Sequence, residues 1–250
     1  MGQTIIHAGF HKTGTTSLQI FLRSHRAALK RANTAFYTGM FRDGNHVELH
    51  ACAMRPERPS GFKTRNALVV DERFRNQVAR SVHRFLKNNK QRNLLFSNEG
   101  VSLLRYPDEF ERLAALFERR PLRFVFARRH PERWWNSYCG QVASLGLGSD
   151  LPPDHFANVE PDSWLRDLDA RLEAFRAYFG AEAVSVVDYD DAVAAQGNII
   201  PAFCEAFGIS EVLRQVDVSA YRSNRSAVGA VKRNKRPLLW SLRPFSAPHG

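Results

Sequence analysis

The stretch Gly9-Phe-His-Lys-Thr-Gly-Thr-Thr16 decides the fold class, because it joins an apolar run to an amphipathic segment. Residues 4–8 suit a short buried strand, and residues 17–30 carry apolar side chains at helical spacing. A glycine-containing loop between a strand and a helix is a site for anions, since the loop amides and the positive end of the helix point at the ligand. The stretch therefore predicts a phosphate-binding strand–loop–helix unit.

The rest of the chain alternates apolar runs with amphipathic segments. Further strands are predicted at residues 93–96, 122–127 and 183–187. Helices are predicted at residues 46–54, 71–87, 107–119, 131–144, 163–179 and 199–207. This alternation predicts an α/β fold of the three-layer P-loop type, in which helices flank both faces of a parallel sheet. We expect one domain over residues 1–220 and a basic C-terminal extension over residues 221–250.

The charge of the chain is strongly positive and unevenly distributed. The formal net charge is +11, and residues 221–250 contribute seven Lys or Arg with no Asp or Glu. A basic surface suits an anionic partner: a nucleotide, a polyanionic glycan, nucleic acid or an anionic membrane. Charge alone does not choose among these partners.

The composition also indicates the cellular compartment and whether a metal site is expected. The three cysteines lack metal-ligand spacing, which predicts free thiols in a reducing compartment and no metal site. The sequence shows neither an apolar stretch of membrane-spanning length nor a secretory signal pattern. We therefore expect a cytoplasmic protein.

The phosphate loop departs from the Walker pattern of nucleotide triphosphatases. The spacing from Gly9 to Gly14 fits G-x-x-x-x-G-K-[ST], but Thr15 stands where that pattern needs Lys, and Lys12 comes before the second glycine. No Walker-type aspartate for magnesium is evident after the strand at residues 122–127. These departures count against an ATPase or a conventional kinase, and an atypical P-loop kinase stays open as an alternative.

The segment His-Lys-Thr-Gly-Thr-Thr at residues 11–16 resembles the 5′-phosphosulfate-binding loop of sulfotransferases, written P-K-[ST]-G-T-[TS]. These enzymes use 3′-phosphoadenosine 5′-phosphosulfate (PAPS) as donor and release 3′-phosphoadenosine 5′-phosphate (PAP). The one departure is His11, where many members have Pro. The resemblance implies that the 5′ end of the donor is bound by His11, Lys12, Thr13, Gly14, Thr15 and Thr16, with Lys12 also acting on the leaving oxygen.

A second motif follows the strand at residues 122–127. Arg128-Arg129-His130-Pro131, with Ser137 eight residues after Arg129, resembles the 3′-phosphate motif of the same family, an R-x-P segment with Ser at that spacing. An Arg at the carboxyl end of a strand can hold a phosphate through two hydrogen bonds. The resemblance implies that Arg129 and Ser137 bind the 3′-phosphate; spacing favours Arg129, and Arg128 either pairs elsewhere or substitutes for it. A solvated basic turn is the simpler alternative for this motif taken alone.

Two residues are candidates for the base that removes the acceptor proton. Asn45-His-Val-Glu-Leu49 is similar to an N-H-x-x-L segment of bacterial glycan sulfotransferases, and Ser97-Asn-Glu99 is similar to an S-S-E segment. His46 has a slight lead over Glu99, because histidine titrates near neutral pH. His50, one helical turn after His46, is a further alternative.

The motifs together predict transfer of a sulfuryl group from PAPS to a hydroxyl of an acceptor, which is a small molecule or a glycan, with a glycan or glycolipid favoured. The basic charge of the chain suits an anionic acceptor. We expect residues 36–62 and 145–161 to shape the acceptor site. Nucleic acid is not an expected partner, whereas the basic extension offers peripheral membrane contact. A protein that only binds anions, nucleic acid or membranes remains the alternative from another class.

Overall fold

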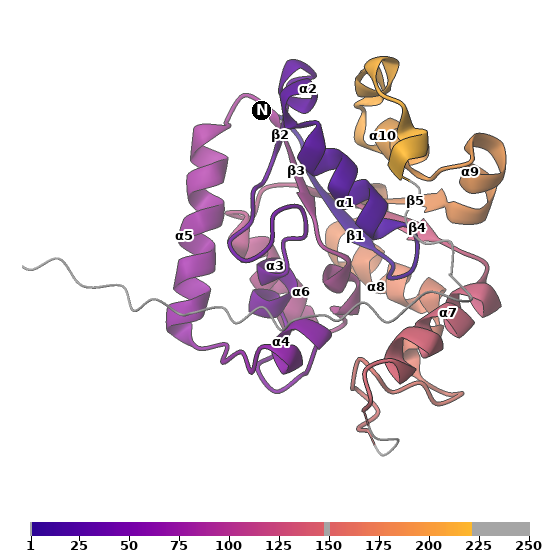
Figure 1. Cartoon of the computed structure of the whole chain (residues 1–250). Helices are drawn as coiled ribbons and strands as arrows, with labels where there is room; N and C mark the ends of the chain where they lie inside the picture. Colours follow the sequence, from indigo (N-terminus) through magenta and orange to yellow (C-terminus); the bar gives the residue numbers. More distant parts are fainter. Residues whose placement is uncertain (1, 148–150, 222–250) are drawn as a thin grey trace, which may run out of the picture.

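The computed structural model describes residues 2–147 and 151–221, which form an α/β domain around five parallel strands (Figure 1). The strands are β1 (Thr4–Gly9), β2 (Thr34–Phe36), β3 (Asn93–Ser97), β4 (Leu122–Arg128) and β5 (Val184–Asp188). Their order in the sheet is β2-β3-β1-β4-β5. Strand β1 is central, and Ile6 lies opposite Phe96 on one side and Phe124 on the other. The predicted parallel sheet of a P-loop-type fold is confirmed.

Helices cover both faces of the sheet, since successive side chains of a buried strand point to opposite faces. One face, which includes Ile5, packs against α1 (Thr15–Ser24), α2 (Arg26–Arg31), α9 (Tyr189–Gln196) and α10 (Ile200–Phe207). The other face, which includes Ile6, packs against a larger group. This group contains α3 (Glu48–Ala53), α4 (Gly61–Arg65), α5 (Glu72–Asn88), α6 (Pro107–Leu116), α7 (Pro131–Ala143) and α8 (Leu168–Phe179). Figure 1 shows the two helical layers on either side of the strands.

The sequence-based element boundaries differ from the structure in a few places. Strand β2, helix α4 and helix α9 were not predicted. The predicted helix at residues 163–179 is a 3-10 turn, Trp164–Arg166, followed by α8, because the Asp167 side chain accepts from the Ala170 amide and starts the helix there. The amphipathic segment after the phosphate loop breaks at His25 into α1 and α2.

The carboxyl ends of the strands bring the candidate site residues to one edge of the sheet. Strand β1 runs into the phosphate loop, β3 runs towards Glu99, β4 ends just before Arg129, and β5 leads directly to Tyr189. In open α/β sheets ligands bind at this edge. Among the described residues, no helix has the length and apolar character that crossing a bilayer requires. The predicted basic extension, residues 221–250, lies outside the described ranges except for Tyr221.

Candidate active site

The phosphate loop is a rigid connection held from several sides. Its backbone turns through positive φ angles at Gly9 (102°), Lys12 (65°) and Gly14 (77°). A Cβ atom on Gly14 would lie 2.7 Å from the Ile199 side chain, so only glycine fits at the start of α1. The resulting loop wraps the amino end of α1 with its backbone close to the open edge of the sheet, as an anion site requires.

Two hydrogen bonds fix the loop from within and from a neighbouring helix. The Thr13 hydroxyl donates to the Phe10 carbonyl at 2.6 Å, and the Trp134 indole of α7 donates to the His11 carbonyl at 2.8 Å. Lys12 is half-buried, and no carboxylate among the described residues forms an ion pair with it. The loop thus presents one unneutralised cation together with its backbone amides.

The two arginines after β4 have different partners. Arg128 donates to both carboxylate oxygens of Asp169, at 2.8 and 3.1 Å. Arg129 lies 3.6 Å from the nearest oxygen of Asp190, beyond hydrogen-bond length, and its Nε atom is buried with no hydrogen-bond partner in the described part of the chain. Arg129 is therefore ion-paired with Asp190 without a hydrogen bond, and its buried Nε–H donor is unused, whereas Arg128 forms two hydrogen bonds to Asp169.

Arg129 is connected to the phosphate loop through Tyr189. The guanidinium carbon of Arg129 lies 5.2 Å from the centre of the Tyr189 ring. A Cβ atom built on Gly14 would lie 3.5 Å from the same ring. The loop after β1 and the arginine after β4 therefore flank one aromatic side chain. Ser137 is half-buried on α7, and no hydrogen bond joins it to Arg129.

A nucleotide phosphorylated at both ends fits these residues. The loop is a cradle that a Cβ at Gly14 would obstruct, and the unsatisfied Arg129 Nε is a second donor beyond Tyr189. Lys12, Gly14, Thr15 and Thr16 could hold one phosphate group, and Arg129 another. A metal centre has no counterpart here: residues 2–147 and 151–221 contain no group of three His, Cys, Asp or Glu side chains suited to a metal ion.

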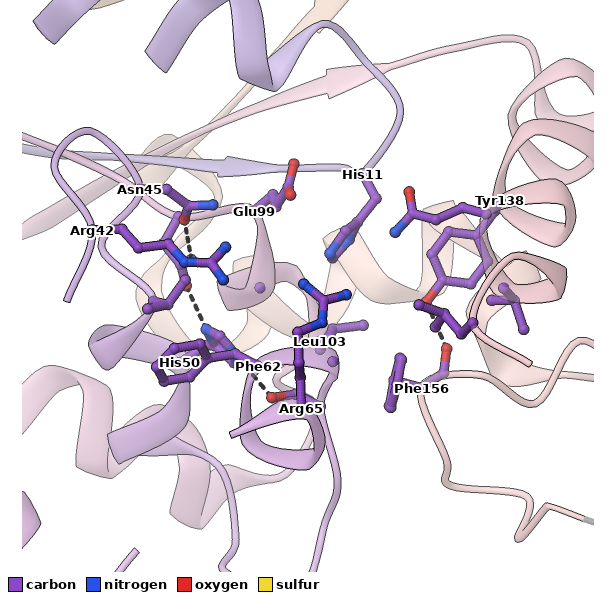
Figure 2. A pocket seen from close by; sticks show the side chains of 18 residues that line it. His11, Arg42, Asn45, His50, Phe62, Arg65, Glu99, Leu103, Tyr138 and Phe156 are labelled. Atoms are coloured by element: carbon purple, nitrogen blue, oxygen red, sulfur yellow. Dashed lines mark hydrogen bonds between the residues drawn. The ribbon is translucent and has the colours of Figure 1, made fainter. Parts of the chain in front are cut away.

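A cavity of about 130 Å³ adjoins the phosphate loop on the side of α3 and α4 (Figure 2). Its lining comes from the loop itself, from the chain before and within α3 and α4, from the turn after β3, and from α7. Figure 2 shows Glu99 on one side of the cavity, Tyr138 and Phe156 on the other, and His11 beside Tyr138. The cavity is the natural place for a molecule that reacts with a group bound in the loop.

Glu99 joins the two parts of the site. The Thr15 hydroxyl at the start of α1 donates to its Oε2 atom, while the side chain lines the cavity. A Cβ on Gly9 would lie 3.2 Å from the Cα and Cβ atoms of Glu99, so the loop and the turn after β3 are in close contact. Glu99 is the one carboxylate among the described residues that line the cavity. It is therefore placed to accept a proton between the phosphate loop and the cavity.

His46, which the sequence argument put slightly ahead of Glu99, lies in the core. Its side chain is fully buried and does not line the cavity. The ring packs 4.9 Å from Tyr37 and 5.1 Å from Phe36, and its Nδ1 atom accepts from the Ser97 amide at 3.0 Å. Burial lowers the pKa of His46 to about 3. The argument from neutral titration fails, because desolvation keeps this imidazole neutral and packing seals it off.

His50 lines the cavity but has both ring nitrogens engaged. Nδ1 donates to the Asn98 side-chain oxygen at 2.8 Å, and Nε2 accepts from the Ser60 hydroxyl at 2.9 Å. Asn98 in turn donates to Asn45 at 2.8 Å. Burial lowers the pKa of His50 to about 3. This chain joins the two segments that the sequence singled out, Asn45–Leu49 and Ser97–Glu99, and gives His50 a positioning role.

Other residues of the site carried no recognisable sequence signal. Arg42 and Arg65 reach the cavity from the loop before α3 and from the end of α4. Arg171 is a buried cation of α8 whose guanidinium lies 4.5 Å from the Phe10 ring. Burial lowers the pKa of His11, and the positive charges of Arg171 and Lys12 lower it further, whereas the negative charge of Glu99 raises it. Their positions depend on tertiary contacts, which a motif does not contain.

Comparisons with solved structures bear on the fold. A search of curated proteins returned no match. The sulfotransferase crystal structure from Alicyclobacillus acidocaldarius is similar in fold, with a TM-score of 0.50 and 14% identity over 89% of this chain and 100% of that one. The sulfotransferase domain from the curacin biosynthetic pathway has a TM-score of 0.48 and 16% identity over 87% of this chain and 79% of that one.

The family comparison covers most of the sequence. The family model described as "Sulfotransferase family" matches residues 5–212, from the start of β1 to the turn after α10. The match includes the phosphate loop, Glu99 and Arg129. The chain belongs to the sulfotransferase family.

Proposed function

We propose that the protein transfers a sulfuryl group from PAPS to a hydroxyl group of an acceptor. The observation that carries the proposal is the arrangement around Tyr189, which has the phosphate loop on one side and the unsatisfied Arg129 on the other. A donor with phosphate at both its 3′ and 5′ positions needs two anion sites at one sheet edge. A nucleoside triphosphate carries its phosphates in one chain and has no use for the second site.

The two anion sites divide the donor between them. Lys12, Gly14, Thr15 and Thr16 bind the 5′-phosphosulfate, with His11 and Thr13 shaping the loop. Arg129 binds the 3′-phosphate, and Ser137 on the following helix adds a hydroxyl. Arg128 has no part in this, because Asp169 holds both ends of its guanidinium.

The transfer is an in-line displacement at sulfur. The acceptor oxygen forms a bond to sulfur while the bond from sulfur to the bridging phosphate oxygen breaks, and the electron pair of that bond stays on the phosphate of PAP. The acceptor proton passes to the carboxylate of Glu99, which lines the cavity beside Thr15. Lys12 stabilises the negative charge that develops on the leaving oxygen. We propose Glu99 rather than His46 as base, since His46 is sealed in the core.

As acceptor we propose a glycan or glycolipid hydroxyl. The cavity combines flat aromatic walls, Phe62 and Phe156, with amide groups from Asn45 and Gln141, and a sugar ring uses both kinds of contact. The cavity is polar enough to receive several hydroxyl groups while it holds one of them against Glu99.

A transfer assay tests the proposed function. The purified protein is incubated with PAPS and a panel of saccharides, phenols and lipids, and mass spectrometry follows PAP and the sulfated product. We expect PAP to form in step with one product that is heavier by a sulfuryl group, without added magnesium. Lys12→Ala serves as the inactive control. Phosphorylation of an acceptor from ATP, with no reaction from PAPS, would overturn the proposal.

A further inference from the structure

Two arginines at the cavity stand out from the other cations around it. Arg55, Arg58 and Arg105, which come from the neighbouring loops, all form ion pairs with carboxylates. Arg42 and Arg65 are exposed and form no ion pair with any carboxylate in the described ranges, 2–147 and 151–221. Two unneutralised guanidinium groups therefore line the cavity.

The position of these arginines separates them from the donor site. Figure 2 shows the guanidinium groups of Arg42 and Arg65 directed into the same open space, with Glu99 and the phosphate loop beyond it. The donor phosphates have their own cations in Lys12 and Arg129. Arg42 and Arg65 therefore face whatever enters the cavity from the acceptor side.

The remaining groups of the cavity do not neutralise the two arginines. The carboxylate of Glu99 accepts from Thr15 on the side of the phosphate loop. His11 and His50 add no charge, because burial lowers the pKa of both rings. Arg42 lies 5.7 Å from the centre of the Phe62 ring, a contact that orients a guanidinium and leaves its charge intact. The acceptor side of the cavity thus carries two positive charges against one negative charge at its donor edge.

We propose that Arg42 and Arg65 form an anion subsite, and that the acceptor carries a carboxylate, sulfate or phosphate group in addition to the hydroxyl that is sulfated. The inference rests on the proposed function and narrows its acceptor class. A guanidinium fork matches the paired oxygens of such a group and can hold it through two parallel hydrogen bonds. The anionic group held there fixes which hydroxyl of the acceptor reaches Glu99.

Binding measurements with matched acceptors test the subsite directly. Calorimetry is run with the full chain saturated in PAP, so that the donor site is filled. The ligands are methyl glucoside, methyl glucuronide, methyl glucoside 6-sulfate and methyl glucoside 6-phosphate. We expect at least one anionic glycoside to bind about tenfold tighter than the neutral one, since hydrogen bonds between charged groups are stronger than those between neutral groups. Comparison among the three anions distinguishes carboxylate, sulfate and phosphate as the group recognised.

Matched variants assign the effect to the two arginines. Arg42→Gln and Arg65→Gln should each weaken the preferred anionic glycoside about tenfold and leave the neutral glycoside and PAP unchanged. Arg80→Gln, an exposed arginine of α5 outside the cavity, is the control and should change nothing. Equal binding of neutral and anionic glycosides, no binding of any anionic one, or unchanged binding in both Arg42→Gln and Arg65→Gln would overturn the subsite.

The measurements distinguish failure of the subsite proposal from failure of the proposed function. If PAP does not bind, the donor assignment fails, and the same glycoside titrations without nucleotide then decide the subsite by the same criteria. If PAP binds and PAPS is consumed while charge on the glycoside makes no difference, the subsite alone is wrong.

Discussion

The two halves of the site are built in different ways. The donor half, which comprises residues 9–16 with Arg129 and Ser137, sits directly on the ends of β1 and β4 and on α7. The acceptor half, which comprises residues 37–66, 98–103 and 151–166 of the described chain, consists of loops, short helices and 3-10 turns. Backbone geometry at Gly9, Lys12 and Gly14 sets the course of the donor half, and the Thr13 and Trp134 side chains fix it by hydrogen bonds. The acceptor half has no such frame and needs side chains to hold it.

A buried ion pair performs this task in the acceptor half. Arg58 donates to both oxygens of Glu109 at 2.7 and 2.6 Å, and its Nε atom donates to Asp154 at 2.7 Å. The Arg58 and Glu109 side chains are only 4% and 0% exposed. Glu109 also accepts from the amides of Arg55 and Arg105. The cluster joins three segments distant in sequence, so the acceptor half is a product of tertiary contacts.

The largest expected effect concerns Glu99, which belongs to both halves. Glu99→Gln should lower kcat by about a thousandfold, because the amide cannot take the acceptor proton. PAP affinity should change little, since Gln can still accept from Thr15. The measurement is steady-state kinetics together with PAP calorimetry. Glu57→Gln, on an exposed stretch of the acceptor half, is the control. A loss below tenfold in Glu99→Gln, with a large loss in His46→Gln of unchanged fold, would return the base assignment to His46.

Removing one partner of the buried ion pair should destabilise the acceptor half. Arg58→Met leaves Glu109 buried without its cation, which costs about 3–5 kcal/mol of unfolding free energy. The double variant Arg58→Met/Glu109→Leu should recover part of this loss. Urea unfolding measures both.

The control is Arg55→Met: Arg55 and its partner Asp108 are 36% and 41% exposed, so solvent screens the pair and the variant should lose far less unfolding free energy than Arg58→Met. Equal losses at Arg55 and Arg58 would show that burial does not distinguish the two pairs.

Acid should destabilise the protein mainly through three buried histidines, of which His46 and His50 belong to the acceptor half and His7 to β1. Burial lowers the pKa of His7, His46 and His50 from 6.5 to about 3, so the stability they contribute is complete above pH 6.5 and is lost as the pH falls towards 3. Glu48 opposes them, because burial raises its pKa from 4.5 to about 7 and the folded chain holds a proton that the unfolded chain lacks.

At about pH 5.5, three protons gained by the unfolded histidines, less the one retained by folded Glu48, give a net difference close to two for these four groups, and His11, whose pKa burial also lowers, adds to it. The unfolding free energy should therefore fall by about 2–3 kcal/mol per pH unit as the pH is lowered through about 5.5. Urea midpoints around this pH measure the slope, and His50→Gln should reduce it by about half. A free energy that does not change around this pH would contradict the burial of these rings.

The smallest expected effect separates the two arginines of the donor half. Arg129→Ala should weaken PAP binding by about ten- to a hundredfold, since it removes charge-assisted hydrogen bonds to the 3′-phosphate. Binding of adenosine 5′-monophosphate should be unchanged by the substitution. Arg128→Ala is the matched control and should leave both affinities near the original values, because Asp169 already holds Arg128. A larger loss in Arg128→Ala would reverse the assignment.

The donor half could be predicted from the sequence because it follows local rules. A strand, a glycine turn and a helix start lie within sixteen residues, and strands β1, β3, β4 and β5 were all predicted from apolar runs. Strand β2 was missed, because three residues show no periodicity and its pairing with Asn93–Leu95 is long-range. The assignment of the donor residues to particular phosphates stays a prediction.

The acceptor half could not be predicted from local sequence in this way. Gly44-Asn45-His46 looks like an exposed polar loop, and only the fold shows that Phe36, Tyr37 and Phe96 close over His46. Arg42 and Arg65 are two of many arginines in a basic chain, and neither belongs to a motif. Whether a carboxylate neutralises them depends on the packing of segments far apart in sequence.

Titration of adenosine nucleotides into the protein by calorimetry tests the central claim most directly. A site with separate cations for the 5′ and 3′ phosphates predicts that PAP binds without magnesium, and at least about tenfold tighter than adenosine 5′-monophosphate. Binding of magnesium–ATP with no detectable binding of PAP would contradict the account.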